Sequence, residues 1–547
     1  MLRRDFLSAS SLAFGFSAPG VGSAASLLAA KSILDHGAVP DGKTMNTQAI
    51  QRAVDAVFRA GGGLVYVPPG VYLTGGVELK SRVTLYLEAG CVLLGSPSIR
   101  DYAYHPGPPM LGDANGHHLI FAQNAEDVTI CGLGTIDGQG QAYWEPNVEH
   151  GPIPPDHAYR DVASGHYHAI DNNNRPSPMV EIAQCRNVRI SGVTLRNSPG
   201  WTLRPIDCEG VVLDGIRIRN PYIGVNTDGM DITACRNVFV SNCDIIGGDD
   251  GICLKSENCY GSDVPVSKNI TITNCVVASA SNGFKMGTAT RGAFENIVFS
   301  NSVIYSDNGS PMMNRVIGGI NIETVDGGSV DGVVISNIRM QNVRAPIFVR
   351  LGQRTKGSGT FLRNVLIEGV DATDAIVTSS ITGVPGLRPT DIVISDCRIR
   401  TVAEGPADWA HREIPEVIDQ YPESWMMGRL PAYGFYVRHA DRVRLRNLEV
   451  IADLPEARPA VVCDDVNDVI LAGLELSAPT GGAAVFVLRN TRRAFLTGMR
   501  APVGSNLFAQ VSGADSADIR LLGNSLDAGQ QAVSYTGGAT ENATKLK

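Results

Sequence analysis

One short phrase recurs along this chain of 547 residues and constrains its fold more than any other feature. It consists of a turn residue, alternating apolar residues, a small or polar pair and a further apolar residue, as in NVFVSNCDI and NITITNCVV. Copies begin at Asn187, Gly210, Asn237, Asn269, Asn296, Gly332, Asn364 and Asp391, and weaker copies at Arg442, Asp468, Arg493 and Asp518. Most intervals span 23 to 36 residues, and the last three span 26, 25 and 25. Strands this short cannot bury an apolar face alone, so the repeats must stack.

Two stacked architectures fit such a repeat. The even spacing would suit propeller blades, but one dominant strand phrase per interval favours the single coils of a parallel β-helix over four-stranded blades. Neighbouring strands of a β-helix lie about 4.8 Å apart, so like positions of successive repeats lie above one another. The sequence therefore predicts an all-β solenoid in which residues one period apart are neighbours in space.

An amphipathic helix is expected ahead of the repeats, between Thr47 and the glycines at 61–63. The apolar residues with helical spacing there are Ala49, Ile50, Ala53, Val54, Val57 and Phe58. We interpret this stripe as core that covers the first coil and caps the solenoid, and not as a binding surface.

Two long stretches, residues 138–178 and 403–433, interrupt the strand pattern. The first holds Trp144, Tyr167 and four of the ten histidines, and the second holds Trp409 and Trp425. The four histidines are His150, His157, His166 and His168. Because long loops on a rigid scaffold often form binding walls, we expect both stretches to border a ligand site. The whole of residues 26–547 is expected to form a single β-helix domain.

The first 25 residues resemble an export signal of the twin-arginine type. Arg3 and Arg4 are followed by a mildly apolar stretch and by small residues near position 24. Removing these residues takes away two arginines and one aspartate, which changes the net charge from −9 to −10. Such acidity argues against a nucleic-acid partner. No segment reaches roughly 18 apolar residues, so we expect a soluble, periplasmic or secreted monomer without a membrane span.

The eleven cysteines give no sign of a metal centre or a cofactor site. They include no CxxC and no Cys/His group with zinc spacing. Cys243, Cys275 and Cys397 occur at the same phase of the repeat, so we expect them to be small core residues that stack from coil to coil.

Three acids are the strongest candidates for catalytic residues in the sequence. Asp249 and Asp250 stand side by side in IIGGDDGICLK, and Asp228 in NTDGMDI precedes Asp249 by 21 residues, close to one coil. Stacking would bring the three carboxylates to one patch. Glycines at 224, 229, 247, 248 and 251 permit sharp bends and the close approach of a ligand, and a bend at 247–248 would let both adjacent acids face one side.

Such a cluster has three interpretations. Solvated surface acids are the first, although the flanking Ile245, Ile252 and Leu254 disfavour full exposure. A hard cation such as calcium is the second, because it takes oxygen ligands. Glycoside hydrolysis is the third, because it needs one acid to protonate the leaving oxygen and a carboxylate to activate water. Crowding raises the pKa of one acid and keeps it protonated, which favours hydrolysis.

Several motifs together resemble glycoside hydrolase family 28, the polygalacturonase family. They include GAVPDGKTMNTQAIQRAVDA, GTIDGQG, NSPGW, NTDGMDI and GGDDGICLKS, and the resemblance runs from about residue 33 to 290. It implies a right-handed parallel β-helix that hydrolyses pectin-derived or related plant polysaccharides with inversion. It also implies that Asp249 is the general acid and that Asp228 and Asp250 hold and deprotonate water. Inverting chemistry calls for carboxylates about 6.5–9.5 Å apart. The two long stretches favour exo action on oligosaccharides.

The sequence departs from the family where the sugar is recognised. The family's Gly-His-Gly corresponds to residues 281–283, with Asn282 in place of histidine, and its carboxylate-binding Arg-Ile-Lys corresponds to residues 321–323, with Glu323 in place of lysine. The residues that could replace this clamp are Arg315, Arg350, Arg354 and Lys285. Glu323 would instead suit the hydroxyls of a neutral sugar. The expected substrate contacts, which could equally be structural, are Asn226, Asn282, Lys285, Glu323, Arg350 and Lys255.

Two other functions fit a β-helix with this acid cluster. A metal-dependent lyase would cleave uronates by β-elimination, with Lys255 or Lys285 as the base that abstracts the proton. A carbohydrate-binding protein that has lost the chemistry would explain the missing histidine and clamp, although the retention of all three acids argues against it.

Overall fold

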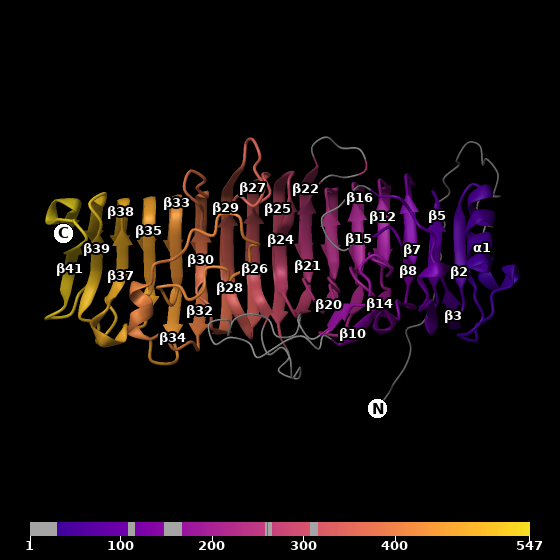
Figure 1. The fold of residues 1–547 in the computed structure, drawn as a ribbon, viewed down its shortest axis with the longest axis horizontal. Helices are drawn as coiled ribbons and strands as arrows, with labels where there is room; N and C mark the ends of the chain where they lie inside the picture. Colours follow the sequence, from indigo (N-terminus) through magenta and orange to yellow (C-terminus); the bar gives the residue numbers. More distant parts are fainter. Residues whose placement is uncertain are drawn as a thin grey trace, which may run out of the picture.

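The repeats wind into a right-handed parallel β-helix, as the sequence predicts (Figure 1). The computed structural model describes residues 30–107, 115–146, 167–257, 260, 265–306 and 316–546. Within these residues, forty strands join one continuous sheet in which neighbouring coils pair in parallel. The predicted export signal, Arg315, and the histidines at 150, 157 and 166 lie outside the described residues.

The strands stack in three ladders. The first contains β1 (Ala30–Ser32), β2 (Gly63–Val67), β5 (Val83–Leu87), β8 (Thr129–Gly132), β13 (Arg186–Ser191), β16 (Glu209–Asp214), β19 (Arg236–Ser241), β22 (Val266–Thr273), β25 (Ala293–Tyr305), β27 (Ser329–Gln341), β29 (Phe361–Ala375), β31 (Thr390–Ser395), β33 (Phe435–Arg446), β35 (Val461–Ala472), β38 (Arg492–Thr497), β40 (Ala517–Leu522) and β42 (Thr544–Leu546). The second contains β3 (Gly70–Thr74), β6 (Cys91–Gly95), β9 (Thr135–Asp137), β14 (Thr194–Arg196), β17 (Arg217–Arg219), β20 (Asp244–Gly247), β23 (Val276–Ser279), β32 (Arg398–Thr401), β34 (Glu449–Ala452) and β36 (Glu475–Leu476), joined by the later parts of β25, β27 and β29.

The third ladder carries the site described below. It contains β4 (Val77–Leu79), β7 (Ile120–Gln123), β12 (Val180–Ala183), β15 (Leu203–Ile206), β18 (Met230–Thr233), β21 (Ile252–Ser256), β24 (Asn282–Thr290), β26 (Val316–Thr324), β28 (Val343–Leu351), β30 (Ser379–Thr382), β37 (Ala484–Arg489), β39 (Leu507–Ser512) and β41 (Gln531–Thr536), with the first parts of β33 and β35. A separate hairpin is formed by β10 (Trp144–Pro146) and β11 (Tyr167–Ala169).

The first residue of each repeat copy adopts the left-handed backbone conformation. All twelve have φ between 50° and 80°, and ten of the twelve are Asn, Asp or Gly, the residue types that tolerate this conformation best. Some also bond along the solenoid: the Asn269 amide donates to Asn237 Oδ1 at 3.0 Å, and the Asn296 amide donates to Asn269 Oδ1 at 3.1 Å. The repeat is therefore a turn signal as well as a core pattern.

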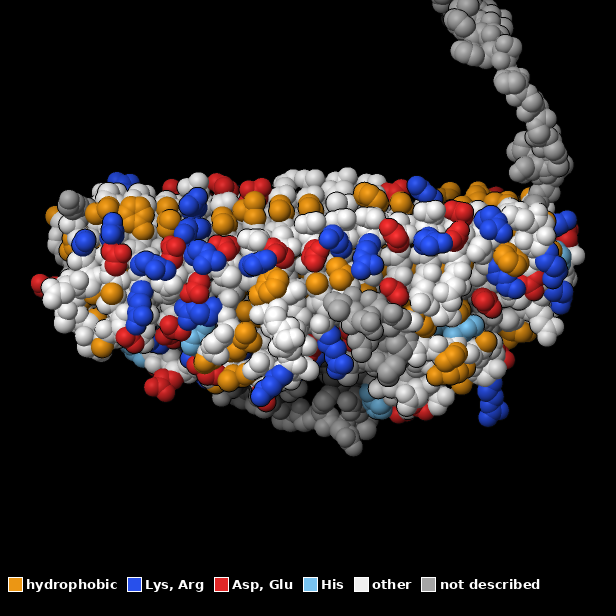
Figure 2. Space-filling model, turned by 90° about the horizontal axis from the view of Figure 1, so that it is seen from above, with side chains coloured by type: hydrophobic (Ala, Val, Ile, Leu, Met, Phe, Trp, Pro, Cys, Tyr) orange, Lys and Arg blue, Asp and Glu red, His pale blue; other side chains and the backbone are white. Residues whose placement is uncertain are grey.

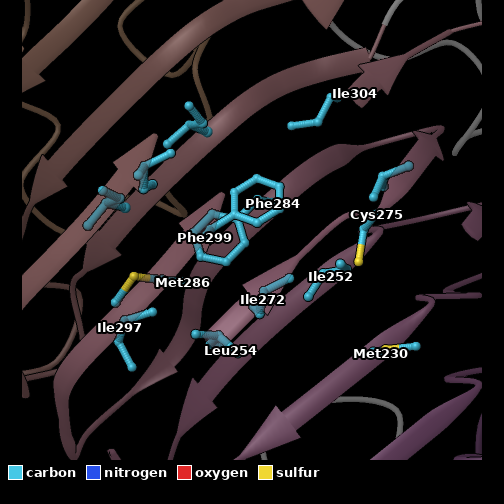
Figure 3. Close-up of a cluster of buried hydrophobic side chains, with 14 of the residues drawn as sticks. Met230, Ile252, Leu254, Ile272, Cys275, Phe284, Met286, Ile297, Phe299 and Ile304 are labelled. Carbon is cyan, nitrogen blue, oxygen red and sulfur yellow. The ribbon is translucent and has the colours of Figure 1, made fainter. Parts of the chain in front are cut away.

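Alternate apolar side chains point into the coils and stack along the solenoid. Met230 pairs with Ile252, and Ile252 with Phe284, and all three are fully buried. Figure 3 shows this core, in which the stacked rings of Phe284 and Phe299 lie 4.8 Å apart. Cys275 lies in the same cluster, as expected from its phase in the repeat. The ten cysteines in the described part of the chain are free thiols.

Helix α1 (Thr47–Arg59) lies at one end of the solenoid and covers the first coil, as predicted (Figure 1). Five of the six predicted apolar residues are buried, but Phe58 is 38% exposed and its ring lies 5.6 Å from the Lys80 ammonium. The expectation that Phe58 belongs to the core is therefore wrong. The short 3-10 helices are η2 (Ile33–His36), η3 (Ile99–Asp101), η4 (Gly140–Tyr143), η6 (Ala407–His411), η7 (Thr480–Gly482) and η8 (Glu541–Ala543).

Segment 403–433 packs on the outer face of the third ladder. Its residues Ile414, Met427 and Leu430 form an apolar cluster with Phe348 of β28 and Tyr436 of β33. Figure 2 shows one face of the molecule, on which basic and acidic side chains are interspersed along its length. Among the described residues, no helix has the length and apolar character needed to cross a membrane.

Candidate active site

The three acids predicted from the sequence lie together on neighbouring coils. Asp228 precedes β18 and Asp250 precedes β21, and these two strands pair in parallel. The N–H of Gly229 donates to the carbonyl of Asp250 at 2.8 Å, so Asp228 and Asp250 hold equivalent positions one coil apart. Carboxylate oxygens of Asp228, Asp249 and Asp250 all lie within 4.8 Å of one another. These oxygens are closer than the separation of about 6.5–9.5 Å expected for inverting enzymes, so the spacing alone does not indicate inversion.

The glycines around the acids are required for space. The chain bends at Gly248 and Asp249, directly after β20, one residue later than the predicted bend at 247–248. A Cβ at Gly248 would lie 2.4 Å from Thr227 Oγ1, and a Cβ at Gly251 would lie 2.3 Å from a methyl group of Val277. None of the five glycines in the two acid motifs adopts the left-handed conformation. The close packing of the coils, and not an unusual backbone conformation, therefore excludes larger residues here.

The two adjacent acids differ in proton affinity. Burial and the neighbouring charge of Asp250 raise the pKa of Asp249 to about 8. Burial would also raise the pKa of Asp250, but the ammonium groups of Lys285 and Lys255 and a hydrogen bond from Asn282 outweigh it, so this pKa lies below its ordinary value. At neutral pH the pair thus holds one protonated and one ionised carboxyl group.

Asp228 is the third acid, and its pKa is raised well above its ordinary value. Burial is the largest cause, followed by the charges of Asp231 and Asp249. Its side chain lines the same cavity as the other two acids. Asp228 is therefore suited to hold a water molecule through a hydrogen bond, while Asp250 is the stronger candidate for the base.

The two residues at the altered histidine motif both contact Asp250. The amide of Asn282 donates to Asp250 Oδ1 at 2.8 Å. The Lys285 ammonium lies 3.3 Å from Asp250 Oδ2 and 3.2 Å from Glu423 Oε1. Both Asn282 and Lys285 are buried and neither lines the cavity. They lie behind the acids and are not placed to contact a substrate.

A second buried lysine, Lys255, also lies close to the acids of the site. The Lys255 ammonium is 3.2 Å from Asp231 Oδ1 and 4.9 Å from the centre of the Trp201 ring. Burial alone would lower the pKa of Lys255, but Cys253, Asp231 and other acids outweigh it and raise this pKa well above its ordinary value. Unlike Lys285, Lys255 lines the cavity.

A cavity of about 500 Å³ opens over the acids. It is lined by Trp201, Asn226, Asp228, Asp249, Asp250, Lys255, Thr288, Ala289, Arg291, Arg354, Thr355 and Tyr421. Asn226 is among the residues predicted to contact substrate, and its side-chain oxygen accepts a hydrogen bond from Arg175 at 3.3 Å. Arg354, one of the possible replacements for the carboxylate clamp, also lines the cavity and forms a bidentate pair with Asp326 at 2.7 and 2.8 Å.

Two predicted substrate contacts, Arg350 and Glu323, lie away from the cavity. The Arg350 guanidinium donates to the backbone carbonyls of Glu416 and Val417 at 3.0 and 2.9 Å, so it anchors segment 403–433. Glu323 is fully buried beside Asn321, and burial raises its pKa well above the ordinary value. Neither side chain can reach a sugar in this structure, and both assignments are corrected on that ground.

Segment 403–433 supplies residues that the sequence did not single out. Tyr421 lines the cavity, and its ring centre lies 5.3 Å from the Lys285 ammonium and 5.4 Å from the Arg354 guanidinium. Glu423 reaches the buried space behind Asp250. The expectation that this segment borders the site is confirmed by Tyr421. In the sequence, only the length of the segment and its lack of strand pattern pointed to this role. Of the other long stretch, 138–178, no described residue lines the cavity.

The three acids are also the group of side chains best placed to hold a metal ion among the described residues. Three oxygens within 4.8 Å of one another suit a hard cation. The ammonium groups of Lys255 and Lys285 already supply positive charge to the cluster, so a cation there would have to overcome their repulsion.

Comparison with known families identifies the family to which the chain belongs. The family description Glycosyl hydrolases family 28 matches residues 110–404, more than half of the chain. Residues 30–144 match Rhamnogalacturonase A/epimerase, pectate lyase-like. The chain therefore belongs to glycosyl hydrolases family 28.

Named relatives match part of the chain. A protein named Probable polygalacturonase from Vitis vinifera is 34% identical over 235 residues, which is 41% of this chain and 44% of that protein. An Exo-poly-alpha-D-galacturonosidase from Dickeya chrysanthemi is 31% identical over 252 residues, which is 40% of this chain and 41% of that protein. The matched region thus spans less than half the length of either relative.

Solved structures support the fold. An exopolygalacturonase from Thermotoga maritima aligns with a TM-score of 0.58 at 23% identity, covering 77% of this chain and 91% of that one. A family 28 exopolygalacturonase from Yersinia enterocolitica aligns with a TM-score of 0.51 at 18% identity, covering 85% and 78%. At these identities the likeness bears on the β-helix alone.

Proposed function

We propose that this chain is an exported glycoside hydrolase that cleaves pectin-derived or related plant polysaccharides by acid–base catalysis at Asp228, Asp249 and Asp250. The observation that carries the proposal is the meeting of these three carboxyl groups, with different proton affinities, in one cavity. Family membership and the named relatives support the same reaction. Export rests on the twin-arginine pattern at Arg3 and Arg4.

The chemistry follows from the protonation states. Asp249, whose pKa is about 8, gives its proton to the glycosidic oxygen as the bond from that oxygen to the anomeric carbon breaks. Asp250 accepts a proton from the water molecule whose oxygen bonds to the anomeric carbon, and Asp228 orients that water. The products are two sugars, and the proton taken up by Asp250 returns to solvent as Asp249 is reprotonated. Because water attacks the anomeric carbon directly and no covalent intermediate forms, we expect inversion there, which ¹H NMR of the first product measures directly.

The cavity also offers cations for an acidic sugar. Arg354 and Arg291 both line the cavity, and Arg291 is exposed. A guanidinium can bind a carboxylate through two parallel hydrogen bonds. We therefore propose that these arginines take the place of the missing Arg-Ile-Lys clamp and that the preferred substrate carries a uronate.

A β-elimination mechanism fits this site less well. It needs a neutral amine to abstract the proton, and the candidates were Lys255 and Lys285. Carboxylates outweigh burial at both residues and raise their pKa values well above the ordinary value, so both remain charged at neutral pH. Hydrolysis needs no such base.

We further propose exo action. Segment 403–433 packs over β28 and β33, the coils that follow the site in the chain, and places Tyr421 in the cavity wall. A groove bounded on that side would accept a chain end more readily than the middle of a long polymer.

A panel of pectic oligosaccharides with product analysis tests these proposals. We expect reducing ends to appear without the near-ultraviolet absorbance of an unsaturated product, and the smallest product to appear from the first time point. An unsaturated product would replace hydrolysis with a lyase reaction. Glycan binding without any cleavage across the panel would favour a binding protein.

A further inference from the structure

Lys285 is a buried cation whose donors are all engaged. Its side chain is 1% exposed. The ammonium lies 3.3 Å from Asp250 Oδ2, 3.2 Å from Glu423 Oε1 and 3.4 Å from the Tyr421 hydroxyl. An ammonium group has three donors, and these three oxygens account for them. Lys285 therefore has no donor left for a substrate.

Asn282 forms a second arm of the same arrangement. Its amide nitrogen donates to Asp250 Oδ1 at 2.8 Å and lies 3.5 Å from both carboxylate oxygens of Glu423. The amide of Asn321 donates to Asn282 Oδ1 at 2.7 Å, which orients the nitrogen of Asn282 toward Asp250. One oxygen of Asp250 is thus held by Asn282 and the other by Lys285.

Glu423 comes from the inserted segment and not from the repeats. It lies 138 positions after Lys285 in the chain, and its side chain is 10% exposed. Removing a charged group from water is costly unless it is paired, so Glu423 and Lys285 depend on each other for burial. The other titratable groups that face this pair are Asp250, Tyr421 and Glu323. Asp250 is itself faced by Asp228, Asp249 and Lys255.

We propose that Lys285 and Glu423 form a positioning pair that keeps Asp250 ionised and fixed in direction, so that segment 403–433 takes part in catalysis through a residue that never touches the substrate. The inference rests on the proposed function in assigning Asp250 as the base. It does not depend on which sugar is cleaved.

The acidic limb of the pH–rate profile tests this pair. Activity falls as pH drops through the pKa of Asp250, because a protonated carboxyl cannot accept a proton from water. A nearby opposite charge lowers the pKa of an aspartate by about 1–3 units, so Lys285→Met should move the acidic limb of kcat/KM upward by about one pH unit or more. Glu423→Gln keeps hydrogen-bonding groups beside Lys285 and Asn282 and should not move that limb upward.

Two results would overturn the pair. One is a Lys285→Met variant with lower kcat but an unmoved acidic limb. The other is an equal upward shift in Glu423→Gln. If Lys285→Met does not fold, Lys285→Met/Glu423→Leu removes both buried charges, which proteins tolerate better than the loss of one. The same upward shift is expected there, and an unmoved limb again contradicts the proposal.

A stability measurement separates this inference from the proposed function. Asp250→Asn should lower the Tm of the otherwise unchanged protein, because it takes a partner from Lys285. In the Lys285→Met/Glu423→Leu background the same change should raise the Tm, because it removes a buried charge that has lost its nearest ammonium and keeps only Asn282 and the charge of Lys255. If Asp250→Asn changes the Tm in opposite directions in the two backgrounds but the protein turns over no substrate, the positioning pair is supported and the hydrolase proposal is refuted. Equal changes in both backgrounds would refute the pair.

Discussion

Asp249 and Asp250 are adjacent in the chain but differ in proton affinity because their neighbours differ. Both are buried, which favours the neutral form of each. The Asn282 amide donates to Asp250, and the Lys285 ammonium lies 3.3 Å from Asp250 Oδ2. The charge of Lys285 also lowers the pKa of Asp249, but burial and Asp250 outweigh it. The ionised Asp250 then raises the pKa of Asp249 further. Asp250 is suited to be the base and Asp249 the acid because Asp250 is the residue of the pair that contacts Asn282 and Lys285 of β24.

The alkaline limb of the pH profile belongs to Asp249. As the general acid it must be protonated, so kcat/KM should fall as pH rises through about 8. Because its pKa is raised in the folded state, Asp249 favours folding at low pH and this contribution is lost as pH rises from its ordinary 3.8 to about 8. Asp249→Asn should therefore raise the Tm at pH 8 and change it little at pH 4. A lower Tm at pH 8 would contradict the assignment.

The role of Arg354 is tested by comparing two substrates. Arg354→Gln should raise the KM for an oligogalacturonide by on the order of tenfold, since a charge-assisted hydrogen bond contributes about 1.5–3 kcal/mol. The KM for the methyl-esterified form should change much less, because the ester has no carboxylate to bind. Arg354 also pairs with Asp326, and any loss of folded protein affects both substrates equally. Equal changes in the two KM values would remove Arg354 from sugar recognition.

Segment 403–433 shows where sequence reasoning reached its limit at the scale of elements. Its length and lack of alternation predicted a wall of the site. Tyr421 and Glu423 could not be singled out, because a loop has no period that converts chain distance into spatial distance. Arg350 was assigned to the substrate on charge alone, and the structure shows that it holds this segment in place.

Loosening the segment should reduce catalysis without touching the cavity. Arg350→Met keeps the length of the side chain but removes the hydrogen bonds to the carbonyls of Glu416 and Val417. We expect kcat to fall on the order of 10- to 100-fold through misplacement of Glu423, and faster hydrogen exchange within 412–425. Arg444→Met is the matched control, because Arg444 bonds the carbonyls of Val443 and Asp468 outside the segment. If Arg444→Met lost as much activity, the effect would be general and the account of the segment would fail.

At the scale of the molecule, the repeat predicted both the fold and the meeting of the three acids. Because coils stack in register, residues 21 positions apart in the chain, Asp228 and Asp249, have carboxylate oxygens within 4.8 Å of each other. The helical spacing of apolar residues ahead of the repeats predicted the helix at the end of the solenoid. It did not predict Phe58 at the surface, because that position is at the edge of the stripe and Lys80 covers its ring. The sequence also did not show that the glycines of the two acid motifs are required by close packing of the coils and not by an unusual backbone conformation.

The left-handed turn residues predict how the solenoid responds to substitution. Asn269→Ala should lower the free energy of unfolding by about 1–2 kcal/mol, the cost of the left-handed conformation for a residue other than glycine. Asn269→Gly should cost less, although both lose the amide ladder to Asn237 and Asn296. Denaturant unfolding measures the difference, and kcat should stay unchanged because Asn269 is exposed on the first ladder whereas the acids lie on the third. Equal losses for Ala and Gly would show that the ladder, and not the backbone conformation, determines this position.

The turnover of Asp249→Asn on the best substrate of the oligosaccharide panel tests the central claim most directly. The matched control is Asp244→Asn, a half-exposed acid five positions earlier that pairs with Arg219. Loss of a positioned general acid removes about 10²- to 10⁴-fold in rate, so we predict a fall in kcat of that size for Asp249→Asn and none for Asp244→Asn. A folded Asp249→Asn protein that retains the kcat of the unchanged chain would contradict the claim that these acids cleave the glycosidic bond.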